Sequence, residues 1–533
     1  MSTTSTDTLA TSQPDSGTPL LAQPADGAET EFLARIEQSI NNLFDPIAAG
    51  LSSFVFYEVS LFGVEFPWIV AWLVLAGFVF TIYFGFIQFR GFKLATEIVR
   101  GKYSRDSDPG EISHFQALSS AVSGTVGLGN IAGVGVAVTI GGAGATFWMI
   151  LAGFLGMCTK FVECTLGVKY REEHPDGTVS GGPMHYLRKG LAERLPGNVG
   201  KIAGTTLAAL ASVMILAFAL GGGNMFQVNQ TVAQLRDTTG GEDGLLAGDG
   251  AALIFGLVLA LIVGAVIFGG IKSIGNVTSR LVPSMALIYI SACAVVILFN
   301  ITSVPDAFRQ IFEGAFTGQG VVGGAIGALI VGFTRAAFSN EAGLGSAPIA
   351  HSAVKTRHSS TEGLVATIEP FIDTVVVCTM TALTIIIASP AIWHEGQQAV
   401  FESGDRSEAP DGVTVTSHAF ETVLPWFPHV LTVAVVLFAI STMITWAYYG
   451  QKAWTYLFGK SNFSENLYRL VFCFFIVVGA VLTFGSVLDF VDATLFLLAL
   501  FNIIGLYVLA PVVKRELRSF MTWVRSREVE KVD

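Results

Sequence analysis

The stretch Ser123-Gly124-Thr125-Val126-Gly127-Leu128-Gly129-Asn130 decides the fold. It lies inside an apolar run from Phe115 to Ile140, which is long enough to cross a bilayer because about 20 helical residues span about 30 Å. Glycine costs roughly 1 kcal/mol relative to alanine in a helix interior, so this stretch predicts a local break. Backbone unwound at membrane depth must face protein or a cavity, and transporters hold substrate and coupling ion at such breaks. The alternative is close helix packing through small residues.

A second stretch repeats this pattern 216 residues further along the chain. Ser339-Asn340-Glu341-Ala342-Gly343-Leu344-Gly345-Ser346 again has Ser-x-x-x-Gly-Leu-Gly followed by a small polar residue, and Pro348 comes soon after it. Paired interruptions of hydrophobic segments in two halves of a chain are the best sequence indication of a transporter binding site. The pair therefore favours a functional site over simple helix packing.

The composition is that of a membrane protein. Hydrophobic residues make up 52% of the 533 residues and charged residues 13%, and the mean hydropathy is +0.61. Soluble domains carry about 25% charged residues. The chain has no Gly-x-Ser-x-Gly elbow, no His-Glu-x-x-His helix and no phosphate-binding loop. We expect no enzyme, no cofactor beyond a coupling ion and no nucleic-acid partner. The five cysteines stand in apolar runs without metal-ligand spacing, so we expect no disulfide framework.

The apolar runs predict an all-α polytopic protein with about eleven transmembrane helices in a lipid bilayer. The expected spans lie near residues 67–89, 112–140, 145–170, 203–232, 251–270, 281–300, 321–350, 364–390, 427–449, 467–488 and 490–512. The predicted organisation is a disordered extracellular tail (1–31), an interfacial amphipathic segment (32–60), an extra first span with a basic cytoplasmic loop (61–111), two five-helix repeats (112–300 and 301–512) and a cytoplasmic tail (513–533).

The charges of the loops alternate in sign and set the expected orientation. Cytoplasmic loops are enriched in Lys and Arg. The loop after the first span carries Arg90, Lys93, Arg100, Lys102 and Arg105, whereas two opposite loops carry Glu242, Asp243 and Asp249, and Glu395, Glu402, Asp405, Glu408 and Asp411. We therefore expect the N-terminus outside and the C-terminus in the cytoplasm. Five spans per unit invert the second copy relative to the first, which is the 5+5 inverted repeat of LeuT-like transporters.

The first break offers groups for an anion and for a cation. The N–H groups of Leu128, Gly129 and Asn130 start a half-helix, where a carboxylate is favoured. Carbonyls from Ser123 to Val126 precede them and can coordinate a small hard cation. The Asn130 side chain is either a further oxygen ligand or a buried amide that joins two helices.

The second break adds Ser339 and Asn340 as polar donors, and Gly343 and Gly345 as positions of close approach. Glu341 needs a partner, a proton or water, because a charge at the bilayer centre costs at least ~2.5 kcal/mol. Arg335 is the expected partner, and an ion pathway is the alternative.

Three further groups of polar residues interrupt apolar spans. Asn224, Gln227 and Gln230 share one helix face, and Gln227 is the predicted substrate ligand, although these amides can equally join helices. Ser441 and Thr442 can complete a sodium site opposite the first break or can bond to their own helix, and Trp446 shares a face with Thr442. The pair Glu369 and Asp373 indicates either a proton or cation path or a capped helix end. His114, His185 and His351 are expected to be solvated or interfacial.

Several runs resemble a known family. GTVGLGNIAGVG (124–135), GGAGATFWM (141–149), FTRAAFSNEAGLGSAPIAHSA (333–353) and EPFIDTVVVCTMTAL (369–383) resemble the signature regions of the alanine/glycine:cation symporters. The resemblance covers roughly Pro67 to Leu509. It implies a LeuT-like core in the cell membrane and sodium-driven uptake of small neutral amino acids, chiefly alanine and glycine, by alternating access.

The resemblance also implies the sites. It implies an amino acid near Gly127, Gly129, Asn130, Gln227, Ser339, Gly343, Thr442 and Trp446, with Leu128, Asn340 and Gly345 beside them. It implies one sodium on the carbonyls of Ser123 and Val126 with the hydroxyls of Ser441 and Thr442, and a second on Thr125, Asn130 and Ser339. Leu128 stands where family members commonly carry Ser or Thr, which bears on the alanine and glycine preference. A proton-coupled amino-acid carrier and, from another class, a channel or solute sensor are the alternatives.

Overall fold

The structure is a computed structural model that describes residues 26–61, 64–105, 107–175, 177–241, 244, 250–267, 270–317 and 323–529. Most of the predicted N-terminal tail, residues 1–25, lies outside the described residues. So do Glu242, Asp243 and Asp249 of the predicted acidic outer loop and the last four residues of the predicted cytoplasmic tail.

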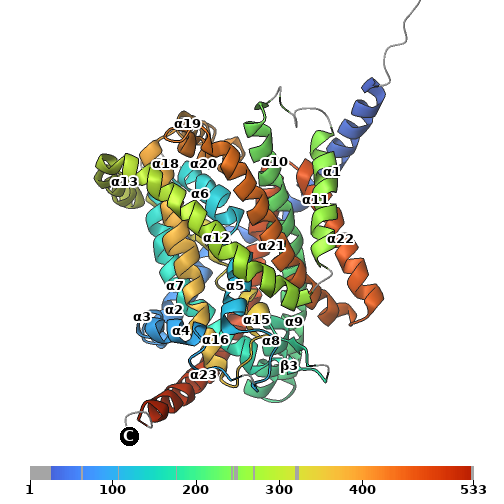
Figure 1. The fold of residues 1–533 in the computed structure, drawn as a ribbon, viewed down its shortest axis with the longest axis vertical. Coiled ribbons are helices and arrows are strands. Elements are labelled where there is room, and N and C mark those ends of the chain that lie inside the picture. Colours follow the sequence, from blue (N-terminus) through green and yellow to red (C-terminus); the bar gives the residue numbers. More distant parts are fainter. Residues whose placement is uncertain are drawn as a thin grey trace, which may run out of the picture.

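The described chain is a bundle of long helices (Figure 1). A helix satisfies its own backbone polar groups, which lipid cannot do. The first half contains α1 (Asp26–Val55), β1 (Glu58–Leu61), β2 (Val64–Pro67), α2 (Trp68–Tyr83), α3 (Ile87–Arg90), α4 (Phe92–Val99), α5 (His114–Thr125), α6 (Leu128–Ile140), α7 (Ala145–Lys169), β3 (Glu172–Glu173), β4 (Val179–Ser180), α8 (Pro183–Arg194), α9 (Gly197–Leu220), a π-helical turn (Gly221–Met225), α10 (Phe226–Thr238), α11 (Ala251–Ile267) and α12 (Gly270–Phe299).

The second half continues in the same way. It contains a 3-10 turn (Ile301–Ser303), α13 (Val304–Thr317), α14 (Gly324–Asn340), α15 (Ala347–His351), α16 (Ser359–Ala366), α17 (Ile368–Pro370), a π-helical segment (Phe371–Cys378), α18 (Thr379–Ala388), α19 (Ala391–Ser403), a 3-10 turn (Arg406–Glu408), α20 (Gly412–Glu421), α21 (Phe427–Phe458), α22 (Asn462–Val481) and α23 (Phe484–Val529). The four short strands form two antiparallel hairpins, in which Glu58 pairs with Pro67 and Glu172 with Ser180.

Both predicted breaks are confirmed. Helix α5 ends at Thr125 and α6 begins at Leu128, with Val126 and Gly127 extended between them. Helix α14 ends at Asn340, and the chain then passes through left-handed conformations at Glu341, Gly343 and Gly345, with φ angles of 56°, 98° and 77°. Glycine adopts such angles freely, whereas Glu341 is strained there by roughly 1–3 kcal/mol.

The predicted polytopic architecture is also confirmed. Eight helices or joined helix pairs among the described residues are long and apolar enough to cross a membrane, and the shorter apolar helices α2 and α11 occupy two more predicted spans. The second broken helix, α14 with α15, occupies the remaining one. The count of eleven stays a prediction, because length and composition alone do not establish each crossing.

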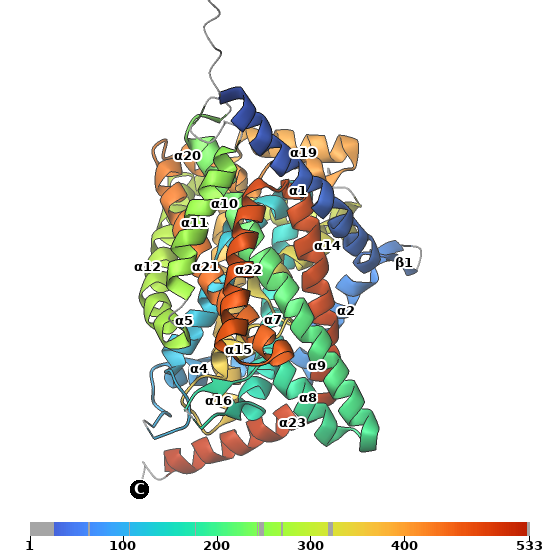
Figure 2. The same cartoon turned by 90° about the vertical axis from the view of Figure 1, so that its right-hand side faces the viewer.

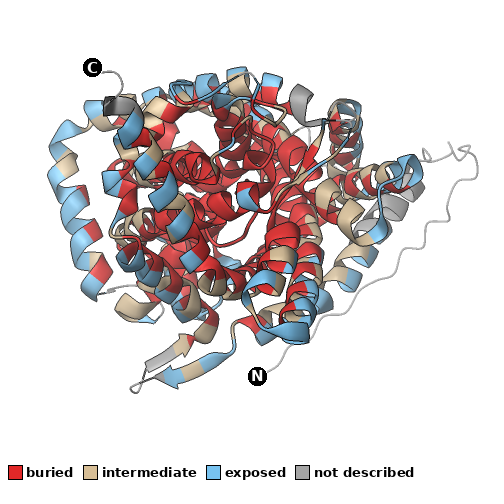
Figure 3. Cartoon of the chain, turned by 90° about the horizontal axis from the view of Figure 1, so that it is seen from below, coloured by how far each residue is buried: buried red, intermediate tan, exposed pale blue. Residues whose placement is uncertain are grey.

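The first broken helix lies at the centre of the bundle. Every residue of its most apolar window is buried. Seen from below, buried residues fill the middle of the molecule and exposed residues surround it (Figure 3). Helix α6 packs against α14, α18 and α20, and α5 packs against α12 and α21. The two breaks are therefore enclosed by both halves of the chain.

The two ends of the described chain are helical and packed. Helix α1 begins at Asp26, five residues before the predicted end of the disordered tail, and crosses the outside of α23 (Figure 2). Its Asn41 side chain donates to the carbonyl of Val481 (3.2 Å). At the other end, α23 continues beyond the predicted boundary at residue 512 and lies along the lower face, where Glu516 pairs with Lys169 (2.8 Å).

Candidate functional site

The first break is joined to α21 by hydroxyl groups. The Ser123 hydroxyl lies 2.6 Å from the hydroxyl of Ser441, and the Thr442 hydroxyl donates to the Ser123 carbonyl (3.2 Å). Thr445 donates to the Ser123 hydroxyl (3.1 Å). All four residues are buried. The structure thus brings Ser123, Ser441 and Thr442 together as predicted, and it gathers several oxygens around one point.

Gly127 and Gln227 form the next part of the site. A Cβ at Gly127 would lie 2.4 Å from the Thr442 hydroxyl, so the break and α21 are in direct contact here. The N–H of Leu128, at the start of α6, donates to the Gln227 side-chain oxygen (3.3 Å). The amide of Gln227 donates to the carbonyl of Gly222 in the π-helical turn (2.8 Å). Gln227 therefore connects the predicted carboxylate-binding end of α6 to the wall opposite.

The other amides near Gln227 join helices to one another, which was the alternative to a role in substrate binding. Asn224 donates to the Phe472 carbonyl (2.8 Å) and Asn229 to the Leu482 carbonyl (2.7 Å). Gln230 donates to the Asp411 carboxylate (2.9 Å). These three side chains join the π-helical turn and α10 to their neighbours, and among these four amides only Gln227 reaches the break.

The two breaks meet at Asn130. Its amide nitrogen lies within 3.0 Å of the Ser339 hydroxyl, 2.7 Å of the Asp373 carboxylate and 3.2 Å of the Asp373 carbonyl. The Asp373 carboxylate also accepts from Ser339 (2.7 Å) and Thr374 (2.8 Å). Sequence reasoning did not place Asp373 in the site, although it stands in the fourth family-like run (369–383). Thr125, predicted beside Asn130, bonds instead to carbonyls of its own helix.

Glu341 has a different partner from the predicted one. Arg335 forms a buried ion pair with Asp492 of α23, so the predicted Arg335–Glu341 pair is wrong. Glu341 accepts instead from the Trp446 indole N–H (2.9 Å) and the Ser346 hydroxyl (2.5 Å). The left-handed turn at Glu341 reverses the chain at this point, which carries the carboxylate to α21 rather than back along α14.

Aromatic rings form the apolar wall of the site. Trp446 lies edge-on to Phe218, with ring centroids 4.8 Å apart, and its Cβ would lie 2.3 Å from a Cβ placed at Gly223. Phe338 lies edge-on to Phe226 (4.8 Å), and its ring lies 3.5 Å from a Cβ placed at Gly129. This wall leaves little space beside the first break.

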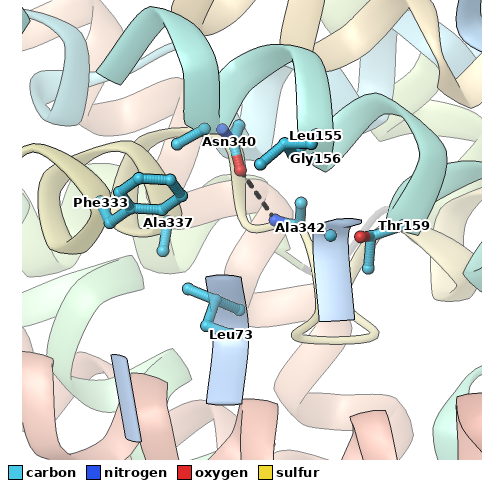
Figure 4. A pocket seen from close by; sticks show the side chains of 10 residues that line it. Leu73, Leu155, Gly156, Thr159, Phe333, Ala337, Asn340 and Ala342 are labelled. Carbon is cyan, nitrogen blue, oxygen red and sulfur yellow. Dashed lines mark hydrogen bonds between the residues drawn. The ribbon is translucent and has the colours of Figure 1, made fainter. Parts of the chain in front are cut away.

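Three predicted substrate residues lie elsewhere. The Asn340 side chain accepts from the Ala342 N–H (3.0 Å) and lines a small hollow between α2, α7 and α14 (Figure 4). The Gly343 carbonyl accepts from Asn502 of α23 (2.8 Å). Gly345 packs against Pro183 and Tyr186 of α8. These residues shape the second break from its far side, and the structure does not bring them to Asn130.

His114, His185 and His351 are buried, so the prediction that they are solvated is wrong, and their interfacial position stays a prediction. His114 and His351 both bind the Glu362 carboxylate, and His351 binds Glu369 through its other ring nitrogen. Glu369 also pairs with Lys160 (3.2 Å). His185 is buried too, and its burial lowers the pKa of its imidazole to about 4. The pair Glu369 and Asp373 is thus divided between two clusters, and neither residue lies at an exposed helix cap.

Both ends of the site are covered. On one side, Thr416 of α20 donates to the Ile131 carbonyl (3.0 Å) and Trp393 of α19 to the Val138 carbonyl (2.9 Å), so the α19–α20 hairpin lies on α6. A hollow of about 370 Å³ beside it is lined by residues that include Arg335 and Asp492. On the other side, Arg171 donates to the carbonyls of Ser352, Val354, Pro109 and Thr356. The enclosed groups offer hydroxyl and carbonyl oxygens, which can coordinate a small cation, and N–H groups at the start of α6, which can bind an anion.

Known proteins of similar sequence share most of this chain. A model of the sodium:alanine symporter family matches residues 52–533. The sodium/alanine symporter AgcS of Methanococcus maripaludis is 38% identical over 85% of this chain and 94% of its own length. The probable sodium/glutamine symporter GlnT of Bacillus subtilis is 33% identical over 85% of this chain and 87% of its own. The crystal structure of MhsT in complex with L-phenylalanine shares the fold, with a TM-score of 0.50 at 14% identity over 77% of this chain and 99% of MhsT.

Proposed function

Because the chain belongs to the sodium:alanine symporter family, we propose that it moves a small neutral amino acid together with sodium through the site where its two helix breaks meet. The protein is a multi-pass membrane transporter and not an enzyme, and its likeness to MhsT confirms the predicted LeuT-like fold. The observation that supports this site best is the contact of Asn130 with both Ser339 and Asp373.

We place one sodium between the first break and α21. The carbonyls of Ser123 and Val126 and the hydroxyls of Ser441 and Thr442 are oxygen ligands, which hard cations prefer. Three of these residues are already in mutual contact. Binding of an ion here would tie α5 to α21 through the ion in place of direct hydrogen bonds.

We place a second sodium at Asn130, Ser339 and Asp373. Four acceptor atoms surround the Asn130 amide, which has two hydrogens to donate. Acceptors thus outnumber donors, and the Asp373 carboxylate supplies negative charge. Thr125 remains a candidate ligand through its carbonyl.

The amino acid would bind with its carboxylate at the start of α6. There the Leu128 N–H is held by Gln227, which a carboxylate can replace. Relatives are named for alanine and for glutamine, so membership alone does not choose the side chain. The close approach of Gly127 to Thr442 and of Gly223 to Trp446 supports alanine or glycine.

The proposed orientation places α19 and α20 outside and the end of α23 in the cytoplasm. Lys514, Arg515 and Arg518 stand in the second half of α23, whereas the acidic Glu402 stands in the last turn of α19 and Asp405 and Glu408 stand between α19 and α20. Lys and Arg mark the cytoplasmic side. A membrane potential of 100 mV then supplies about 2.3 kcal/mol for each sodium, or roughly a fiftyfold gradient of amino acid.

Uptake of radiolabelled alanine into proteoliposomes tests this function. We expect alanine to accumulate under an inward sodium gradient, and we expect glycine to compete with it. No alanine should accumulate under a potassium gradient or a pH gradient alone. Thr442→Ala should raise the half-saturating sodium concentration about tenfold, because it removes an ion ligand and its charge-assisted contact. Thr432→Ala on the same helix is the control, since Thr432 bonds to Gln234 and lies two to three turns away. Accumulation driven by a proton gradient alone would contradict sodium coupling and favour the proton-coupled carrier.

The α19–α20 hairpin gives a pH prediction. His418 contacts Asp237 of α10 (3.3 Å), and this hydrogen bond, with the charge of Glu421, raises the pKa of His418. The contact between His418 and Asp237 is therefore intact below the ordinary histidine pKa and is lost as the outer pH rises through the raised pKa of His418. The pair is partly exposed, so we expect uptake to rise about twofold at most between outer pH values of about 6 and 8. Asp237→Asn should remove that rise, and His429→Gln should keep it.

A further inference from the structure

Lys160 of α7 is a fully buried cation that belongs to none of the sodium and amino-acid sites proposed above. Its side chain is 0% exposed, and its ammonium lies 3.2 Å from the Glu369 carboxylate. A charge inside a membrane protein costs at least ~2.5 kcal/mol unless it is paired. Removing one member of such a pair is strongly destabilising, because the other charge stays buried. A lysine at this place therefore needs several counter-charges around it.

Three carboxylates act on this ammonium, those of Glu369, Glu341 and Glu163. Glu163 stands one turn after Lys160 on α7 and accepts from the Gly345 N–H (2.8 Å). Glu341 opens the second break and accepts from Ser346, near its other end (2.5 Å). Two of the three carboxylates thus hold the residues of the second break, and Lys160 is the cation that allows them to lie together.

The third carboxylate, that of Glu369, extends the cluster to α15 and α5. Glu369 binds His351, the last residue of α15, and His351 binds Glu362 through its other nitrogen. Glu362 also binds His114, the first residue of α5. A histidine that contacts two carboxylates through both ring nitrogens either is protonated and donates from both nitrogens, or is neutral and accepts a proton-bearing contact from one carboxyl group. His351 can therefore balance Glu369 in part, and the charge of Lys160 also acts on Glu341.

The cluster ends at the amino-acid site. The Glu341 carboxylate accepts from the indole N–H of Trp446 (2.9 Å), and Trp446 forms the aromatic wall with Phe218. Glu341 reaches this position only through its left-handed backbone at φ 56°. An anion in a strained conformation stays there only when its surroundings determine it.

We infer that Lys160 is a positioning residue of the amino-acid site: it is the permanent, covalently attached cation of the second break, and it acts on the substrate through Glu341 and Trp446. The first break would take a mobile sodium, whereas the second break is built around this ammonium. The inference rests on the proposed function, because that proposal places Trp446 beside the amino acid.

Equilibrium binding of radiolabelled alanine to the purified full-length protein in saturating sodium tests the inference. Lys160→Met should weaken alanine binding about thirtyfold or more, as does truncation of one partner of a buried charge pair. The half-saturating sodium concentration at the Ser441 and Thr442 site should stay within about twofold. Lys169→Met, whose lysine pairs with Glu516 at the cytoplasmic end of the same helix, is the matched control and should bind normally.

Two double variants separate positioning from folding. Lys160→Met with Glu341→Gln keeps the net charge of the cluster, and the glutamine oxygen can still accept from Trp446, so binding should recover to within about threefold of the original protein. If Lys160→Met alone does not fold, this variant decides the matter. In a Trp446→Phe background, adding Lys160→Met should weaken alanine binding by less than about a further threefold. The reason is that both changes break the same chain of contacts.

The outcomes are distinct. Unchanged alanine affinity in the folded Lys160→Met protein, no recovery in the folded double variant, or losses that multiply with Trp446→Phe would each overturn the inference. If the original protein binds and accumulates no alanine under any sodium gradient, the proposed function fails instead.

Discussion

Gly127→Ala is expected to lower sodium-driven uptake at least about a hundredfold, because a displacement of about 1 Å of the groups that hold a ligand is enough for such a loss. The added Cβ would lie 2.4 Å from the Thr442 hydroxyl and 3.4 Å from the Gln227 oxygen. The backbone at Gly127 is extended, with φ −148°, so alanine tolerates its conformation. The loss comes from space alone: α5 and α21 must separate exactly where they are proposed to share a sodium.

Uptake by Gly133→Ala provides the comparison. Gly133 lies on α6, and a Cβ there would meet the Phe338 ring at 3.6 Å, an ordinary van der Waals distance. This variant should keep most of the original rate, and size-exclusion chromatography should show both proteins folded. Equal rates for the two variants would show that the contact between the first break and α21 is not needed for transport.

The breaks were predictable because their signal is local. Glycines at Gly127, Gly129, Gly343 and Gly345 weaken a helix wherever they stand, and the repeated pattern identified them as a pair. The hydroxyls of Ser441 and Thr442 were likewise visible as polar residues in an apolar helix. Their contact with Ser123 followed from the resemblance, since nothing local relates residues more than 300 positions apart.

The division of Glu369 from Asp373 could not be predicted from spacing. Residues four apart share a face of an α-helix. Here the chain from Phe371 to Cys378 is π-helical, and a π-helix turns less per residue, which moves later side chains to another face. Glu369 therefore points to His351 and Asp373 to Asn130.

Buried ion pairs were missed for a different reason. Arg335 was assigned to Glu341 because the two are close in sequence, yet its partner Asp492 lies on α23. His114 and His351 stand near predicted helix ends, where solvent is the usual environment. Glu362 follows both in the chain and lies 248 residues from His114. Such pairs depend on how distant helices pack, which no local pattern records.

Asp373→Asn is the second variant with a large expected effect. Asparagine keeps the shape of the side chain and can still accept from Ser339 and donate or accept near Asn130, so the variant removes a charge and little else. Loss of an anionic ligand should raise the half-saturating sodium concentration at least about tenfold, since ligand charge sets the affinity of oxygen sites for cations. If two sodium ions act together, the Hill coefficient for sodium should also fall from about two toward one.

Asp489→Asn separates this effect from a general loss of negative charge. Asp489 is an exposed carboxylate of α23 that lines the outer hollow, and its neutralisation should leave sodium activation unchanged. The two variants carry the same chemical change at different distances from the crossing of the breaks. If sodium activation of Asp373→Asn matches that of Asp489→Asn, the carboxylate at Asn130 and Ser339 serves only to join the helices, and the sodium at Ser441 and Thr442 alone couples transport. A selective loss in Asp373→Asn would instead mean that the crossing binds an ion, so that both breaks take part in holding the coupling cations.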